Sequence, residues 1–280
     1  MAKTAIITGG AGGMGLATAR LLGADHRIVL ADLDQERLDT AAAILADNGI
    51  EAGTFVCDIT DRDSVGGLFR DAAGGGTVRA VVHTAGVSPQ MGDAAKMIRI
   101  NALGTVNLTK AALGAAGEGF ALVNVASIAG HLIPRAIQPR RSYRLALTDP
   151  ERFTAKLTTV AHRAPQRLRS GLAYGISKHF VIWFSQEMAE SFGAKGARIL
   201  SVSPGSFDTA MGRLEEASGS GRLVDHAALQ RYGRPEEVAE VLAFCASERP
   251  GYLTGTDILC DGGVNAGLGR KDRLAMASGR

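Results

Sequence analysis

Short apolar runs rich in β-branched residues alternate with longer stretches of helical periodicity along most of the chain. Residues 5–7 and 80–82 are apolar at every position, which is typical of strands buried on both faces of a sheet. Apolar runs separated by helical patterns predict repeated β-α-β units and a parallel sheet. We expect strands at residues 4–8, 27–32, 53–57, 78–84, 120–126, 198–202 and 256–260.

Helices are indicated by their first residues as well as by their periodicity. Within residues 35–47, Leu38 and Leu45 fall on one face, and Asp34 directly precedes this segment as a candidate N-cap. Pro235, followed by two glutamates, marks another helix start. Since such helices cover both faces of a parallel sheet, the pattern predicts an α/β fold with a doubly wound parallel sheet, the Rossmann fold.

One region, residues 131–170, interrupts this alternation. A helix start at Asp149 is followed by Phe153 and Leu157 on one face of a short amphipathic helix. Neither an internal repeat nor a low-complexity linker divides the chain. We therefore expect a single domain over residues 1–280, with residues 131–170 as a helical insertion.

Composition narrows the class of protein. Hydrophobic residues make up 46% of the chain and charged residues 21%, an ordinary balance for a globular protein. No apolar run is long enough to cross a membrane, and the first residues lack the pattern of a secretory signal, so we expect a cytoplasmic protein. The three cysteines are isolated, which predicts neither a disulfide framework nor a metal site.

Charge is distributed unevenly. The net charge is only +3, but residues 131–170 hold nine basic and two acidic side chains. A run of basic residues usually reflects solvent exposure, and we expect neither a nucleic-acid nor a membrane partner. Two interpretations stay open for this insertion: a surface flap, or a segment that shapes the substrate mouth through residues such as His131, Arg135 and Phe153.

A glycine-rich loop, TGGAGGMG at residues 8–15, follows the first expected strand and opens a helix. Glycines allow the tight turn and let backbone N–H groups approach a pyrophosphate, which then lies at the positive end of the helix dipole. The sequence thus predicts a dinucleotide site. Its candidate residues in the loop are Gly9, Gly13, Met14 and Gly15.

Asp32 ends the second expected strand, where a carboxylate can accept hydrogen bonds from the ribose hydroxyls. The same carboxylate would repel a 2′-phosphate. No Arg or Lys lies inside the glycine loop or directly after Asp32 to offset this repulsion. We therefore expect NAD as the cofactor, in preference to NADP.

Tyr174 and Lys178 are four residues apart, hence on the same face of a helix. A phenol is a poor base at neutral pH, and a nearby cation favours its ionised form. This pair is therefore a candidate proton-transfer device.

At this point the chain resembles the short-chain dehydrogenase/reductase family, over nearly its whole length from Thr8 to Gly263. The resemblance rests on TGGAGGMG at 8–15, Asp58-Ile59, Thr84-Ala85-Gly86, Asn101 in IRINALGT, Ser127 in VNVASIAG, YGISK at 174–178, Pro204-Gly205 with Thr209, and Asp261-Gly262-Gly263.

The resemblance implies a role for each matching residue. Tyr174 would be the general acid/base, and Ser127 would hydrogen-bond the substrate oxygen. Lys178 would favour ionisation of Tyr174 and bind the nicotinamide ribose, while Asn101 would hold a water that links Lys178 to solvent. Further cofactor contacts would come from Asp58, Ile59, Ala85, Gly86, Pro204, Gly205, Phe207 and Thr209.

The chain departs from the family pattern in two places. His83 stands where the family has an asparagine that contacts the strand framework, and we expect His83 to fill that structural place. The gap between Ser127 and Tyr174 is unusually long, and bacterial 3α-hydroxysteroid dehydrogenase/carbonyl reductases carry an insertion at about this place. Family helices beginning near Asn101 and Tyr174 usually pack against another subunit, so we expect a homo-oligomer, in which the insertion favours a dimer over a tetramer.

Three functions remain to be distinguished. The first is an NAD-dependent oxidoreductase acting on a secondary alcohol or ketone, such as a hydroxysteroid or another apolar alcohol. The second is an NADPH-dependent 3-oxoacyl-thioester reductase, whose acidic substrate would suit the basic insertion but not Asp32. The third is a nucleotide-sensing protein that has lost turnover, although the Asn, Ser, Tyr and Lys set is complete.

Overall fold

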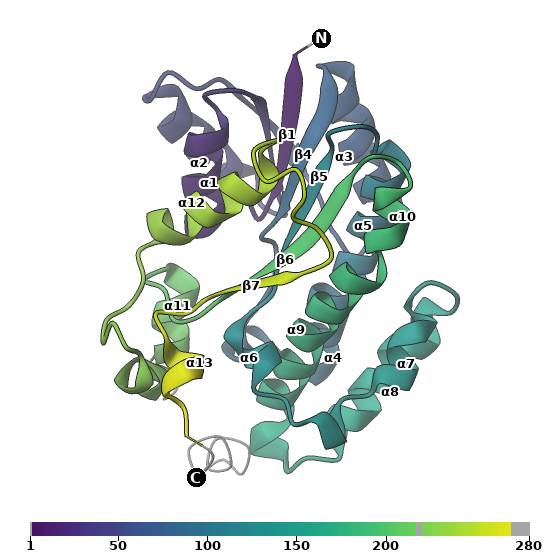
Figure 1. Cartoon of the computed structure of the whole chain (residues 1–280), viewed down its shortest axis with the longest axis vertical. Helices are drawn as coiled ribbons and strands as arrows, with labels where there is room; N and C mark the ends of the chain where they lie inside the picture. Colours follow the sequence, from purple (N-terminus) through teal and green to yellow (C-terminus); the bar gives the residue numbers. More distant parts are fainter. Residues whose placement is uncertain (1, 217–219, 270–280) are drawn as a thin grey trace.

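Seven parallel strands form one sheet in the order β3-β2-β1-β4-β5-β6-β7 (Figure 1). The structure is a computed structural model that describes residues 2–216 and 220–269. The strands are β1 (Lys3–Thr8), β2 (Arg27–Asp32), β3 (Ala52–Val56), β4 (Thr77–His83), β5 (Ala121–Val125), β6 (Arg198–Pro204) and β7 (Asp257–Cys260). All seven expected strands are therefore confirmed, with ends shifted by no more than two residues.

Helices cover both faces of this sheet. The α-helices of the described residues are α1 (Gly13–Leu22), α2 (Gln35–Ala46), α3 (Arg62–Gly74), α4 (Ala94–Met97), α5 (Gly104–Ala115), α6 (Ile128–His131), α7 (Arg140–Tyr143), α8 (Pro150–His162), α9 (Arg169–Glu187), α10 (Ala189–Gly193), α11 (Ala210–Glu216), α12 (Pro235–Ala246) and α13 (Val264–Gly267). Successive strand residues point to opposite faces, so Ile6 packs toward α3, α5 and α9, whereas Ile7 packs toward α1, α2 and α12. The doubly wound Rossmann fold is confirmed.

Three predicted helix starts are also present. Asp34 accepts a hydrogen bond from the backbone N–H of Arg37 at 3.1 Å, and Asp149 accepts one from Arg152 at 3.0 Å. Each carboxylate satisfies an N–H group that has no partner within the helix. Pro235 begins α12.

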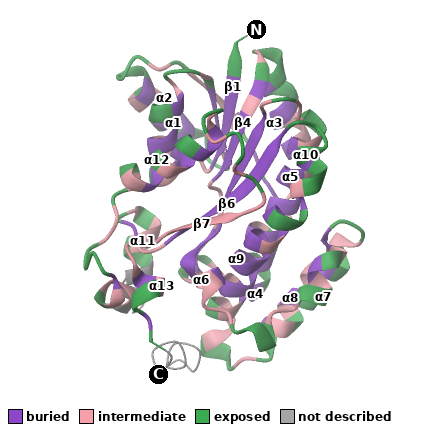
Figure 2. Ribbon diagram, in the orientation of Figure 1, coloured by how far each residue is buried: buried purple, intermediate pink, exposed green. Residues whose placement is uncertain are grey.

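The insertion packs along the outer side of α9, where Figure 1 shows α7 and α8 beside the lower part of that helix. Phe153, Leu157 and Ala161 form the buried face of α8 (Figure 2). Eight of the nine basic side chains between residues 131 and 170 are exposed, and Arg169 is half-buried. The positive charge therefore faces solvent while the apolar face of α8 joins the core.

Within residues 2–216 and 220–269, no helix is both long and apolar enough to span a bilayer. Cys57 and Cys245 are buried and Cys260 is half-buried, all three as free thiols. Burial raises the pKa of each thiol, to about 11 for Cys245, which keeps them protonated at neutral pH.

Candidate functional site

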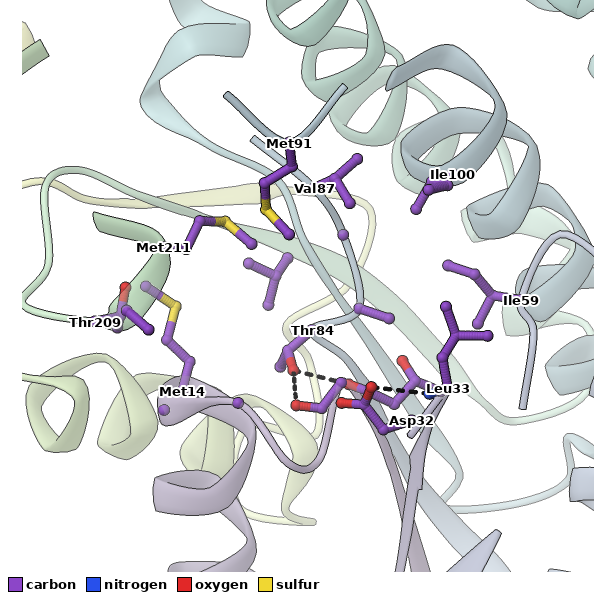
Figure 3. A pocket seen from close by; sticks show the side chains of 18 of the residues that line it. Met14, Asp32, Leu33, Ile59, Thr84, Val87, Met91, Ile100, Thr209 and Met211 are labelled. Carbon is purple, nitrogen blue, oxygen red and sulfur yellow. Dashed lines mark hydrogen bonds between the residues drawn. The ribbon is translucent and has the colours of Figure 1, made fainter. Parts of the chain in front are cut away.

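A cavity of about 730 Å³ lies at the carboxyl ends of the central strands, where ligands bind in open α/β sheets (Figure 3). It brings together most of the residues singled out in the sequence. Those lining it are Gly9, Gly13, Met14, Asp32, Asp58, Ile59, Ala85, Gly86, Ser127, Tyr174, Lys178, Pro204, Gly205, Phe207 and Thr209. Of the candidate catalytic and cofactor-binding residues, only Gly15 and Asn101 are not part of this lining.

The glycine loop turns sharply between β1 and α1. Gly9 has φ +67°, and a Cβ atom there would lie 2.7 Å from the backbone nitrogen of Ala85. A Cβ at Gly15 would lie 2.4 Å from the carbonyl oxygen of Gly9. Since neither position has room for a side chain, the loop can fold tightly over the end of the sheet and leave the N-terminus of α1 facing the cavity.

Asp32 lies at the end of β2, with its side chain 14% exposed. Its Oδ1 accepts a hydrogen bond from Leu33 N at 2.8 Å and is 3.9 Å from Nη1 of Arg37. Arg37 lines the cavity and also donates to Ala11 O at 3.4 Å. Arg37 was not predicted as a site residue, because it lies neither in the glycine loop nor directly after Asp32. Capping by Asp34 places Arg37 in the first turn of α2, beside the cavity.

Ser127 and Lys178 are anchored around the end of β5. Ser127 caps α6 by accepting a hydrogen bond from Ala129 N at 3.2 Å. Lys178 donates from Nζ to Val125 O at 2.9 Å, and Nζ lies 5.9 Å from the centroid of the Tyr174 ring. Serine, tyrosine and lysine thus reach one cavity from two elements, the end of β5 and the middle of α9.

Asn101 lies in a π-helical turn, residues Ile98–Leu103, that precedes α5. Its amide group accepts from Val87 N and donates to Val87 O, both at 2.9 Å, and its Nδ2 is 3.3 Å from Ser177 Oγ. A Cβ atom built on Gly86 would lie 3.1 Å from Asn101 Oδ1 and 3.5 Å from Lys178 Nζ. The amide oxygen and the ammonium group therefore converge on the same point, at an irregular turn of the kind often found at functional sites.

His83 bridges three elements, as expected from the position that it occupies. Its Nδ1 is 2.7 Å from Thr8 Oγ1 on β1, and its Nε2 is 3.2 Å from Thr105 Oγ1 on α5. Because Thr105 donates its own proton to Asn101 O, the ring must donate from Nε2 and accept at Nδ1. Burial, with a smaller effect of the Lys178 charge, lowers the pKa of His83 to about 3, so the ring is neutral.

No residue of the insertion, 131–170, lines the cavity. His131 Nε2 is instead 2.8 Å from Oδ2 of Asp257 on β7, and Arg135 is exposed. Phe153 packs against Phe180, with 4.7 Å between the ring centroids. A direct role for these three residues at the substrate mouth is therefore not supported. The insertion contacts α9 rather than the cavity because its apolar face matches the outer face of that helix.

Three methionines, Met14, Met91 and Met211, extend into the cavity on the side away from Asp32 and Ile59 (Figure 3). Met91 and Met211 gave no signal in the sequence, since they lie on the segments after β4 and β6, whose path the periodicity does not predict. Thioether side chains are flexible and adapt to differently shaped apolar groups. This end of the cavity is therefore suited to an apolar ligand.

Comparison with known proteins agrees with the fold and the site. Two family models match: "short chain dehydrogenase" over residues 3–139 and "Enoyl-(Acyl carrier protein) reductase" over residues 150–265. A short-chain dehydrogenase/reductase of Alternaria brassicicola is 30% identical over 96% of this chain and 98% of its own length. A cis-4-hydroxycyclohexanecarboxylate dehydrogenase of Sinomonas cyclohexanicum is 31% identical over 94% and 97%.

A solved short chain dehydrogenase from Burkholderia cenocepacia, in complex with NADP, shares this fold. Its TM-score is 0.73 at 24% identity, covering 94% of this chain and 98% of the other. Fold and site together define an NAD(P)-binding oxidoreductase that acts on small molecules. The chain belongs to the short-chain dehydrogenase/reductase family.

Proposed function

We propose that this protein is an NAD-dependent dehydrogenase that interconverts a secondary alcohol and a ketone, with a largely apolar substrate. The observation that carries the proposal is that Ser127, Tyr174 and Lys178 line the same cavity as the glycine loop and Asp32. One cavity therefore offers both a place for a dinucleotide and groups able to move a proton.

The residues present fit a nicotinamide dinucleotide. The loop at Gly9 and Gly15 has no room for side chains. The N-cap of α1 is Gly12, which has no side chain to cap the helix, so the first N–H groups of α1 are open to a pyrophosphate. Asp32 would accept from the ribose hydroxyls, and Ile59 would border the adenine. When bound, the nicotinamide supplies the hydride acceptor or donor.

The chain itself supplies the proton chemistry. We assign Tyr174 as the group that takes the hydroxyl proton in oxidation and returns it in reduction, and Ser127 as the donor that orients the substrate oxygen. The bond to Val125 O holds the Lys178 ammonium close to the Tyr174 ring, where its charge favours the phenolate. Asn101, fixed to Val87 and Ser177, sets the position of the turn that faces Lys178.

The methionine-lined end of the cavity favours an apolar substrate. Met14, Met91 and Met211 can repack around rings of different shape, as thioethers do at adaptable binding surfaces. The relative from Sinomonas cyclohexanicum is named for a hydroxylated six-membered ring that also carries a carboxylate, so its apolar ring, but not its charge, is compatible with such a substrate.

Steady-state kinetics with NAD and NADP over a panel of steroids, terpenoid alcohols and 3-hydroxyacyl thioesters tests the proposal. We expect turnover with NAD and an apolar secondary alcohol. A preference for NADPH with 3-oxoacyl thioesters would favour the reductase alternative. Tight NADH binding with no turnover on any substrate would favour a nucleotide-sensing protein.

A further inference from the structure

The chain from Gly130 to Tyr143, which includes the first third of the insertion, lies against the turn of α9 that holds Tyr174 and Lys178. Contact begins at Gly130, where a Cβ atom would lie 2.8 Å from His179 N and 2.9 Å from the carbonyl carbon of Lys178. Backbone therefore packs directly on backbone at the end of this turn.

A second contact lies one turn earlier in α9. A Cβ atom at Gly175 would lie 2.4 Å from Cδ1 of Ile133, so the Ile133 side chain occupies the space beside the backbone next to Tyr174. The catalytic turn is thus in contact with the preceding chain at both of its ends.

Tyr143, the last residue of α7, makes the third contact and the only one by hydrogen bonds among the three. It is fully buried, and its hydroxyl is 3.2 Å from Ile176 O and 3.1 Å from His179 Nδ1. Its ring packs edge-on against Phe180 at 5.2 Å between centroids, and its centroid is 5.4 Å from that of Trp183.

The hydroxyl joins two neutral groups. Burial raises the pKa of Tyr143, and burial followed by the Arg140 charge lowers the pKa of His179 to about 4. A single orientation satisfies the contact: the hydroxyl donates to Ile176 O and accepts from the Nδ1–H of His179. Both partners lie within or next to the turn from Tyr174 to Lys178, and a hydrogen bond at this place fixes how the turn is rotated about the axis of α9.

We propose that Tyr143 is a positioning residue that keeps the side chains of Tyr174 and Lys178 directed into the cavity. Through Tyr143, the insertion would stabilise the active site from the side of α9 that faces away from the cavity. The proposal rests on the assignment of Tyr174 and Lys178 above. Displacement of a catalytic group by about 1 Å can cost two orders of magnitude in rate, so one bond from outside the cavity can matter for turnover.

The test uses Tyr143→Phe in the full-length protein. This substitution keeps the aromatic ring and leaves His179 Nδ1 buried without its partner. We expect kcat to fall about tenfold with little change in the Kd for NADH, since β1, β2 and their loops are untouched. In the oxidation direction, the limb of the pH–rate profile that rises as Tyr174 loses its proton should also move to higher pH, because the Lys178 charge stabilises the Tyr174 phenolate less well when the turn is loose.

Phe153→Leu is the matched control. Phe153 belongs to the same insertion and packs on Phe180, but no hydrogen bond links it to the catalytic turn. This variant should lose thermal stability while keeping kcat and the pH profile. Trp183, the single tryptophan of the chain, reports by its fluorescence whether the aromatic cluster is intact in each variant.

Hydrogen exchange gives a result that does not depend on activity. Amides of residues 174–180 should exchange about tenfold faster in Tyr143→Phe than in the parent, with no such change in β1 and β2. Parental protection together with parental kcat would overturn the proposal, as would an equal loss of kcat in Phe153→Leu. If the parent turns over no substrate, the proposed function fails, while exchange still decides whether Tyr143 holds the turn.

Discussion

Tyr174 differs from phenylalanine by the one oxygen that the proposed reaction needs. Tyr174→Phe should lower kcat by at least about 10²-fold, because general acid/base groups contribute 10² to 10⁴-fold, while the Kd for NADH should change little. Stopped-flow turnover and fluorescence titration with NADH measure the two quantities. Tyr252→Phe makes the same change at a fully exposed position and should be neutral. Normal turnover of Tyr174→Phe would place the proton transfer elsewhere.

We predict that cofactor preference depends on two side chains, Asp32 and Arg37, rather than on one. Asp32→Ala should reduce the ratio of kcat/KM for NAD over NADP by about tenfold or more, since a repulsion of about 1.4 kcal/mol corresponds to a factor of ten. This reduction of the ratio should exceed the reduction that loss of the Asp32 charge alone would cause. Arg37, whose Nη1 lies 3.9 Å from Asp32 Oδ1, would become available to a 2′-phosphate. Asp32→Ala combined with Arg37→Ala should recover part of the ratio.

Asp34→Asn is the control for this pair. It removes a carboxylate that also lines the cavity, but it keeps a good N-cap for α2, so the ratio should stay near the parental value. A parent protein that uses NADP as well as NAD would contradict the assignment of Asp32.

His83 makes the protein sensitive to acid. Its pKa is about 3 in the folded state against an ordinary value of 6.5, so the unfolded state binds more protons between these two values and stability falls as the pH drops below 6.5. At pH 5 this costs about 2 kcal/mol. When the pH is lowered from 7.5 to 5, the free energy of unfolding of His83→Asn should therefore fall by about 2 kcal/mol less than that of the parent.

Urea unfolding at the two pH values measures this difference. The exposed His162 provides the control, since His162→Asn removes a histidine without changing a buried one. An identical pH dependence in the parent and in His83→Asn would show that another group controls acid stability.

Elements with a local signal were predictable from the sequence. The strand ends were found because apolar runs stop where the chain leaves the sheet, and Asp34 and Asp149 were found because a cap and its helix are adjacent in sequence. The insertion shows where such reasoning stops. The basic residues of the insertion correctly indicated which of its faces is exposed. The contact between Tyr143 and His179 joins residues that are 36 positions apart, and no periodicity in the sequence predicts a contact at that separation.

The same limit applies to the site. Asp32 was found from its place at the end of a strand, Tyr174 and Lys178 from their spacing on a helix, and Ser127 from the family resemblance. Met91 and Met211 lie on connections whose path depends on packing, and Arg37 reaches the cavity only because α2 starts where it does.

Capping of α8 offers a test at the scale of one element. Asp149→Ala should reduce the free energy of unfolding by about 1 kcal/mol, because Arg152 N would lose its acceptor. Asp149→Asn removes the same charge but retains a capping oxygen, and it should cost much less. Thermal denaturation compares the two. Equal losses would mean that charge, and not the hydrogen bond, stabilises the start of this helix.

Assembly is the question at the scale of the whole molecule. In the family resemblance, the helices that start near Asn101 and Tyr174 pack against another subunit, but here α8 covers α9 through Phe153 and Phe180. We therefore predict a dimer of about twice 29.1 kDa rather than a tetramer. Light scattering coupled to gel filtration measures this mass. A mass of four chains would mean that assembly does not require the surface under α8.

Parallel strands give the molecule a polarity with a practical consequence. All seven run in one direction, so the start of β1 at Lys3 and the mouth of the cavity lie at opposite ends of the sheet, while α13 lies on the cavity side (Figure 1). Anchoring the amino terminus to a bead or an electrode would leave the mouth facing the bulk solution. Attachment through a residue of α13 itself would turn the mouth toward the support and slow the entry of bulky substrates.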